Sequence, residues 1–208
     1  IYVWDPLDKE FKVFNGVTGT YNGQISPFQS FWVRAHGSDP VLSFTDEVFT
    51  DGGVFLRGGD TTINIANYSV PFKLGIDDLS ANSFITFMDE GRDGPDKWDA
   101  FQIKPLSDTW LEVYTTASET QTVPLVINNL PFEGKDYYNL PLYVGGKKNQ
   151  VPIKGDFKLE WEIPDNWPAD WSISLHDHLT QNVIQMQSQH NYVFNYQSEG
   201  LIGSSQSH

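Results

Sequence analysis

Short runs of β-branched and aromatic residues recur along the whole chain, and Gly, Pro, Asn and Asp separate them. No long stretch shows the apolar period and the end caps of a helix. The clearest alternation covers residues 156–163, where every second side chain is apolar. The apolar positions are Phe157, Leu159, Trp161 and Ile163, and the polar ones are Lys158, Glu160 and Glu162. A strand of an antiparallel sheet with one face in the core shows this pattern.

These runs predict an all-β protein with an antiparallel β-sandwich or jelly-roll-like fold, because many strands follow one another at short spacing. Residues 1–4 and 11–14 flank a turn-forming segment and predict a hairpin. Further strands are predicted at 25–35, 61–67, 70–76, 83–88, 110–116, 122–128, 140–146, 157–163, 171–177, 182–188 and 191–197.

The sequence leaves open whether these strands form one continuous sandwich or two abutting β units. For two units, we expect an N-terminal β unit at residues 1–78 that lacks upstream strands, and a β-sandwich unit at residues 79–197. The small, polar residues 198–208 predict a flexible tail.

Charge and composition narrow the range of partners. The 208 residues carry a formal net charge of -14, and the pI is about 4.5. Nucleic acid and an anionic membrane surface would repel such a chain, because binding to either needs clustered Lys and Arg. No apolar run is long enough for membrane insertion, and the absence of Cys excludes disulfides and thiolate metal sites. Neutral glycans, cations and other proteins remain as partners.

The acidic stretch MDEGRDGPDKWDAFQI, residues 88–103, is the strongest candidate for a metal site. Its ligands would be Asp89, Asp93, Asp96 and Asp99. An EF-hand loop that starts at Asp89 fails, because Gly91 and Ala100 stand at its third and twelfth positions, where oxygen ligands are required. Ca²⁺ also accepts irregular oxygen cages, so an irregular Ca²⁺ site stays open beside a plain turn between two strands.

Aromatic residues in predicted loops are the candidate ligand-binding groups. They are Trp167, Trp171, Tyr137 and Tyr138. Exposed rings stack on sugar rings, and binding groups concentrate in loops, so this pattern favours a polysaccharide or a cell-surface glycan as ligand. The alternative is that these rings close the ends of the sandwich.

Two polar pairs raise further alternatives. Glu160 and Glu162 lie on one face of their strand and would supply the acid pair of a jelly-roll glycoside hydrolase. The alternation explains them equally well as part of a solvated face. His176 and His178 share a face in the same way and would bind zinc if a third ligand, such as His190 or His36, lay close to them.

Three stretches together resemble a known family. They are YVWDPLDKEFKVFNG with ISPFQSFWVRA, then DKWDAFQIKPLSDTWLEVYT, and then the segment from LVINNLP to VFNY. Between residues 2 and 196 the chain is similar to the C-terminal β-rich region of Bacteroidetes-type secreted and cell-surface proteins, the part that precedes a type IX secretion sorting domain. A recurrent hairpin pattern, L-x-D…T, falls on Leu175, Asp177 and Thr180, and a closing Y-x-F falls on Tyr192 and Phe194.

The resemblance implies a secreted, extracellular or cell-surface location, a β-sandwich, and an accessory role beside adjacent domains of a parent protein. It supplies no catalytic residue. We therefore expect a non-catalytic module that binds carbohydrate or a cell surface, with a purely structural spacer and a jelly-roll glycoside hydrolase as alternatives. The family's upstream Gly-Asn-Pro turn and its sorting domain are missing, so we expect a piece of a longer protein.

Overall fold

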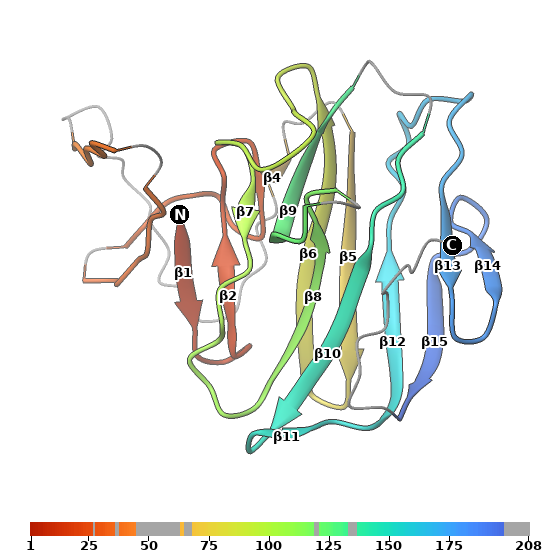
Figure 1. Cartoon of the computed structure of the whole chain (residues 1–208). Helices are drawn as coiled ribbons and strands as arrows, with labels where there is room; N and C mark the ends of the chain where they lie inside the picture. Colours follow the sequence, from red (N-terminus) through yellow and green to blue (C-terminus); the bar gives the residue numbers. More distant parts are fainter. Residues whose placement is uncertain are drawn as a thin grey trace.

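The described part of the chain consists of strands, turns and loops. The computed structural model describes residues 1–26, 28–35, 38–44, 63–64, 68–118, 121–132 and 137–197. These residues contain no helix, which confirms the all-β class, and hence none that could cross a membrane. They form a nine-stranded sheet and three two-stranded sheets (Figure 1). The expected tail at 198–208 lies outside the described residues.

The nine-stranded sheet has the order β11, β10, β8, β9, β6, β5, β12, β15, and β7 pairs with β9. Its strands are β5 (Tyr68–Ile76), β6 (Leu79–Met88), β7 (Ala100–Phe101), β8 (Trp110–Thr116), β9 (Pro124–Pro131), β10 (Leu142–Lys148), β11 (Val151–Pro152), β12 (Gly155–Trp161) and β15 (Asn191–Tyr196). The sheet is mixed rather than wholly antiparallel, because β6 and β9 pair in parallel. The chain passes through β7 and β8 before it returns beside β6, so β9 runs in the same direction as β6.

Three smaller pairs lie outside this sheet. They are β1 (Tyr2–Asp5) with β2 (Glu10–Val13), β3 (Thr18–Gly19) with β4 (Ile63–Asn64), and β13 (Ser174–Asp177) with β14 (Asn182–Gln185). The β1–β2 pair confirms the hairpin predicted from residues 1–4 and 11–14.

The large sheet curls, and its concave side holds the main core (Figure 1). Phe157, Leu159 and Trp161 of β12 are 1%, 2% and 4% exposed and face this core, as their alternation predicts. The β13–β14 hairpin covers the core beside β15, and Ile184 and Met186 are its buried side chains. The Trp161 indole N–H fixes the segment after β14 by donating to the carbonyl of Met186 at 3.0 Å.

The β1–β2 hairpin forms a second core with the sheet. Tyr2 and Val13 pack there with Phe84 of β6 and Ile127 of β9. The amide of Phe101 donates to the Tyr2 hydroxyl at 2.6 Å, which ties β7 to β1. The sheet therefore carries apolar side chains on both faces where β6 and β9 lie.

Two expectations differ from the structure. Residues 25–35 were expected to form a strand, but in the described residues of that segment only Trp32 pairs, through an isolated bridge with Tyr2. Composition does not decide strand formation without a neighbour to pair with. The boundary expected between residues 78 and 79 falls inside the β5–β6 hairpin, which pairs from Tyr68 with Phe87 to Ile76 with Leu79, so both strands belong to one sheet.

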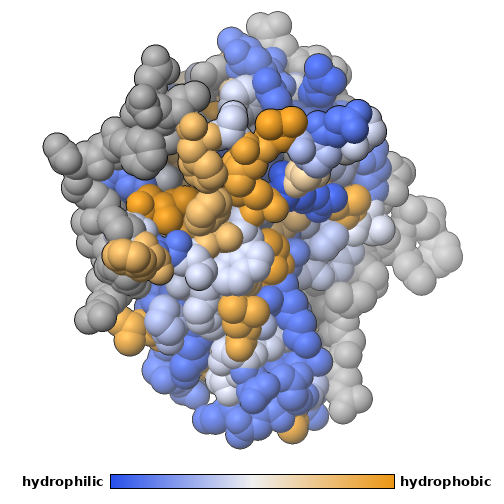
Figure 2. Space-filling model, turned by 90° about the vertical axis from the view of Figure 1, so that its left-hand side faces the viewer, coloured by the Kyte–Doolittle hydropathy of each residue, from blue (hydrophilic) through white to orange (hydrophobic). Residues whose placement is uncertain are grey.

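Apolar side chains remain exposed around the first strand. Figure 2 looks onto this side of the molecule and shows apolar side chains gathered near its middle among polar ones. The large exposed ones between residues 28 and 44 are Phe28, Trp32, Val33, Val41, Leu42 and Phe44.

Candidate functional site

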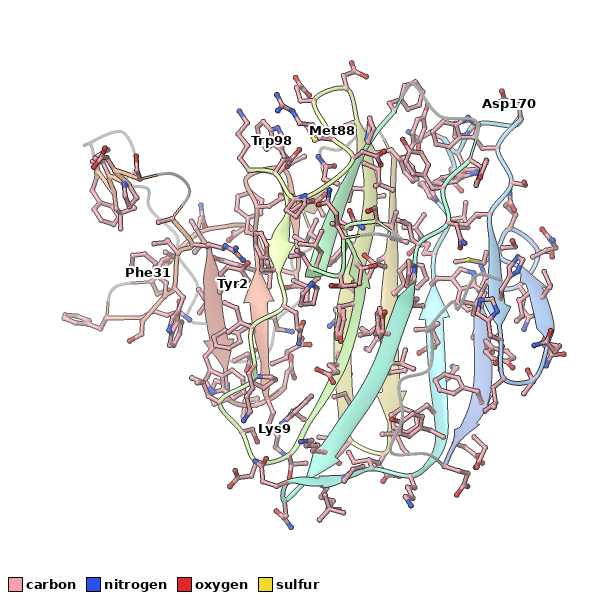
Figure 3. All side chains as sticks on the ribbon, in the orientation of Figure 1. Tyr2, Lys9, Phe31, Met88, Trp98 and Asp170 are labelled. Atoms are coloured by element: carbon pink, nitrogen blue, oxygen red, sulfur yellow. The ribbon has the colours of Figure 1, made fainter. Side chains whose placement is uncertain are left out.

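The acidic stretch forms the loop between β6 and β7, at the end of the molecule that also holds Asp170 (Figure 3). Its buried member, Asp99, accepts hydrogen bonds from the amides of Asn129 and Asp96, both at 2.8 Å. Asp96 accepts one from the amide of Trp98 at 2.6 Å. These two aspartates therefore hold the loop against β9, as side chains in turns often do.

The four aspartates do not form the cage that the calcium prediction requires. Asp89 and Asp93 are exposed while Asp99 is buried. Among the described residues, no group of three or more His, Asp or Glu side chains is placed to hold a metal ion. His176 and His178 have ring centres 6.4 Å apart, and the same finding applies to them and to His190, whereas His36 lies outside the described residues. Burial raises the pKa of Asp99 to about 7, against the opposing hydrogen bonds from Asn129 and Asp96.

The candidate carbohydrate-binding aromatics close one end of the main core. Trp167 and Trp171 are half-buried, lie 5.6 Å apart in a T-shaped arrangement and both contact Phe87. Tyr138 also contacts Phe87 edge-on, and its hydroxyl donates to a backbone carbonyl of β9 at 2.9 Å. Tyr137 is 79% exposed. The structure thus brings together three of the four candidate aromatic residues. Their rings pack against other aromatic rings of the core.

The candidate catalytic pair lies on the exposed side of β12. Glu160 forms an ion pair with Lys158 at 2.5 Å, and both side chains are nearly half-exposed. Glu162 is exposed and follows the end of the strand. This arrangement matches the second of the two interpretations of the alternation, a solvent-exposed strand face, rather than a catalytic acid pair.

A buried network of charges joins the β1–β2 hairpin to the sheet. The Lys12 ammonium, 3% exposed, lies 2.7 Å from both Glu10 and Asp8, and the Asn82 amide of β6 donates to Glu10 at 3.0 Å. Burial raises the pKa of Glu10, and the charge of Lys12 opposes this. A cavity of about 40 Å³ lies beside the network, with Glu10, Asn82 and Glu112 in its lining. Its volume suits one or a few water molecules.

An open cleft lies between the β13–β14 hairpin and β15 and has a volume of about 310 Å³. Its lining is Asp177, Leu179, Thr180 and Asn182 from the hairpin, and Tyr192, Val193, Phe194 and Asn195 from β15. This volume is at the lower end of the range for ligand sites. The cleft is therefore the candidate functional site.

Asp177 organises the hairpin side of this cleft. Its Oδ1 accepts hydrogen bonds from the amides of Leu179 and Thr180, at 2.8 and 3.2 Å. Its Oδ2 accepts the hydroxyls of Thr180 and Tyr192, at 2.8 and 2.7 Å. Partial burial alone would raise the pKa of Asp177, but these hydrogen bonds outweigh it and lower the pKa. Four donors use the acceptor capacity of a carboxylate, so Asp177 fixes the turn to β15 and keeps its charge.

The other wall of the cleft is a sheet edge, because β12 is the only strand that pairs with β15 among the described residues. The amide of Trp161 donates to the carbonyl of His190 at 3.1 Å, in register with the β12–β15 ladder. Opposite residues in an antiparallel ladder alternate between hydrogen-bonded and non-bonded pairs. Residues 192, 194 and 196 therefore direct their backbone groups to β12, and Val193 and Asn195 direct theirs into the cleft.

The two edge strands of the large sheet differ in how well they are protected against pairing with another chain. At β11, Pro152 lacks an N–H, and Lys147 and Lys148 of β10 lie opposite this strand. Proline and lysine are usual ways to stop an edge from pairing with another chain. The sequence of β15, NYVFNY, contains neither. Among the described residues, the Asn191 carbonyl is the only backbone group on the outer side of β15 that has a hydrogen-bond partner. It accepts from the side-chain amide of Gln189 at 2.6 Å.

Sequence reasoning named four of the eight residues that line this cleft, without assigning them a site. Asp177, Thr180, Tyr192 and Phe194 carry the family resemblance, and the structure brings all four together in the lining of the cleft. The available signal was an aromatic-rich predicted strand without Pro, Lys or Gly. It marks an edge only once the strand order is known.

Comparisons with known proteins give no match. No family model, no curated protein and no solved structure is significantly similar to this chain.

Proposed function

We propose that this protein is a non-catalytic accessory module of a larger extracellular protein and that it binds an extended polypeptide segment along β15. The observation that carries the proposal is the open cleft beside β15, where the backbone groups of Val193 and Asn195 have no partner among the described residues. An added strand would satisfy them, as in other cases of β-strand addition. The resemblance to the C-terminal region of secreted Bacteroidetes-type proteins supports the extracellular, accessory part.

The expected affinity fits a partner on the same parent protein. Val193 and Asn195 offer two amides and two carbonyls, and a net contribution of about 1 kcal/mol for each bond gives about 4 kcal/mol. Because association also costs translational and rotational freedom, these backbone bonds alone would give a free peptide a Kd no tighter than about 1 mM. A short linker gives an effective concentration of the same order, about millimolar, so an adjacent segment would occupy the edge while a free one would bind weakly.

The edge can be tested first without a ligand. In amide hydrogen exchange, the amides of Val193 and Asn195 should exchange much faster than those of Tyr192 and Phe194, because only the latter donate within the ladder. Equal protection of all four would mean that the edge is already covered, and the proposal would fail.

Binding is tested with an eight-residue peptide in which Val alternates with Gln, followed through the amide NMR signals of β15. The peptide should shift the signals of Val193 and Asn195. Val193→Pro removes one donor without removing a β12 hydrogen bond and should abolish the shifts, whereas the matched Val193→Thr should keep them. Binding that survives Val193→Pro, in a variant with unchanged near-UV circular dichroism, would place the peptide elsewhere.

Carbohydrate remains the second candidate ligand, favoured by one observation in the same cleft. The rings of Tyr192 and Phe194 are half-buried and stacked, with centres 5.9 Å apart, beside the Asn182 and Thr180 side chains. Retardation in affinity electrophoresis on a polysaccharide, abolished by Tyr192→Ala and kept by Val193→Pro, would favour carbohydrate over polypeptide. A structural spacer predicts that neither ligand binds.

A further inference from the structure

The charge around the β15 cleft restricts the strand that it accepts; this inference rests on the proposed function. Asp177 is the one charged residue in the lining. A second carboxylate, that of Asp156, contacts the lining because it accepts a hydrogen bond from the Asn195 side-chain amide at 2.5 Å. Lys158, on the neighbouring strand, is already paired with Glu160. The charge available to an incoming strand is therefore negative.

The negative charge at Asp177 is permanent under ordinary conditions. Its four donors stabilise the carboxylate rather than the neutral acid. Because they also use its acceptor sites, an incoming cation would interact with Asp177 mainly through charge. Such an interaction weakens as salt is added.

The two sides of an added strand would meet different surfaces. Successive side chains of a strand point to opposite faces of the sheet. One row would face the β13–β14 hairpin, with Asp177 and the exposed Leu179. The other row would lie beside the side chains of Val193, which is 56% exposed, and Asn195. The first row favours basic residues, and the second tolerates apolar ones.

A second copy of this chain is a poor occupant for the same reason. Two β15 edges could pair antiparallel about Val193, but each copy carries a formal net charge of -14 and brings its own Asp177 to the junction. Like charges at an interface oppose association.

We propose that β15 accepts a basic extended segment, with Lys or Arg at alternate positions and apolar residues between them, from an adjacent domain of the parent protein. The segment adds as a strand on Val193 and Asn195 and places its basic row opposite Asp177.

Three eight-residue peptides test this, all with Val at alternate positions and with Lys, Gln or Glu at the others. By fluorescence anisotropy in 50 mM salt, the Lys peptide should bind about fivefold tighter than the Gln peptide, and the Glu peptide should bind weakest. The preference should shrink in 500 mM salt. Val193→Pro should abolish binding of the Lys peptide, which separates strand addition from attraction to an acidic surface.

Two charge variants locate the effect. Asp177→Asn should reduce the preference for Lys over Gln to less than about twofold, and the readout is the ratio of the two affinities measured in the same variant. Asp108→Asn removes one exposed charge near β11 and should leave the preference intact. Equal binding of the Lys and Gln peptides overturns this inference and leaves the proposed function standing. Failure of all three peptides overturns both. A concentration-dependent dimer that Val193→Pro dissolves would identify a second copy as the occupant and also overturn the inference.

Discussion

Removing the buried Lys12 ammonium gives the sharpest test of how the first hairpin is held to the sheet. In Lys12→Met the apolar stem is retained, but Glu10 and Asp8 lose a cation at 2.7 Å. Glu10 is 7% exposed and would stay buried with only the Asn82 amide as a partner. Breaking a buried ion pair from one side costs about 3–5 kcal/mol, since the remaining charge is uncompensated.

The loss is measured as the free energy of unfolding in urea, with wild type and variant at pH 7. Lys158→Met is the matched control, because the Lys158–Glu160 pair has the same chemistry but is nearly half-exposed. The control should lose no more than about 1 kcal/mol. The double variant Glu10→Gln with Lys12→Met should recover most of the loss, because no charge is then left unpaired at Glu10.

The cost of Lys12→Met should also shrink at low pH, because an unpaired buried Glu10 escapes its penalty by taking up a proton. The reasoning is refuted if Lys12→Met and Lys158→Met lose the same free energy. It is also refuted if the double variant is no more stable than Lys12→Met alone. Either result would mean that water reaches the network and screens Glu10.

Three further predictions concern single sites. Burial raises the pKa of Asp99 from 3.8 to about 7, so its contribution to stability is complete below about pH 4 and is lost as the pH rises through 7; relative to Asp99→Asn, wild type should be more stable at pH 5 than at pH 8 in thermal melts. Gly91→Ala pushes a methyl group into a backbone carbonyl of β9 and should cost about 1–3 kcal/mol, whereas Gly145→Ala, with only ordinary contacts, should cost less in the same urea series. Tyr2→Phe removes the hydroxyl that accepts a hydrogen bond from the buried amide of Phe101, and chemical denaturation should show a loss of about 1–3 kcal/mol.

The positions of the strands followed from local pattern, with particular exceptions. The alternation from Phe157 to Trp161 identified both the strand and its buried face, because a period of two admits one arrangement of a half-buried strand. Residues 25–35 have the same composition but pair only at Trp32 in their described part. The parallel pairing of β6 and β9 has no local signal, because it depends on where the chain returns after β7 and β8.

The candidate sites also depend partly on local sequence and partly on tertiary contacts. Sequence reasoning proposed the four aspartates and the loop aromatics from residue type, but residue type does not fix distance. Asp96 and Asp99 hold a loop by their own hydrogen bonds, and Trp167 and Trp171 turn their faces to other rings. Whether a polar or aromatic side chain is free to bind depends on its neighbours, which come from distant parts of the chain.

By itself, the sequence determined the all-β class, most of the strands, the buried face of β12 and the net negative charge. Only the tertiary structure decided that Asp177 binds Tyr192 across the cleft, and that, within the described part of the chain, β15 ends the sheet with backbone groups of Val193 and Asn195 unpaired. The reason is physical. Burial and strand propensity act between near neighbours in the chain, whereas an edge exists only through the order in which remote strands pair.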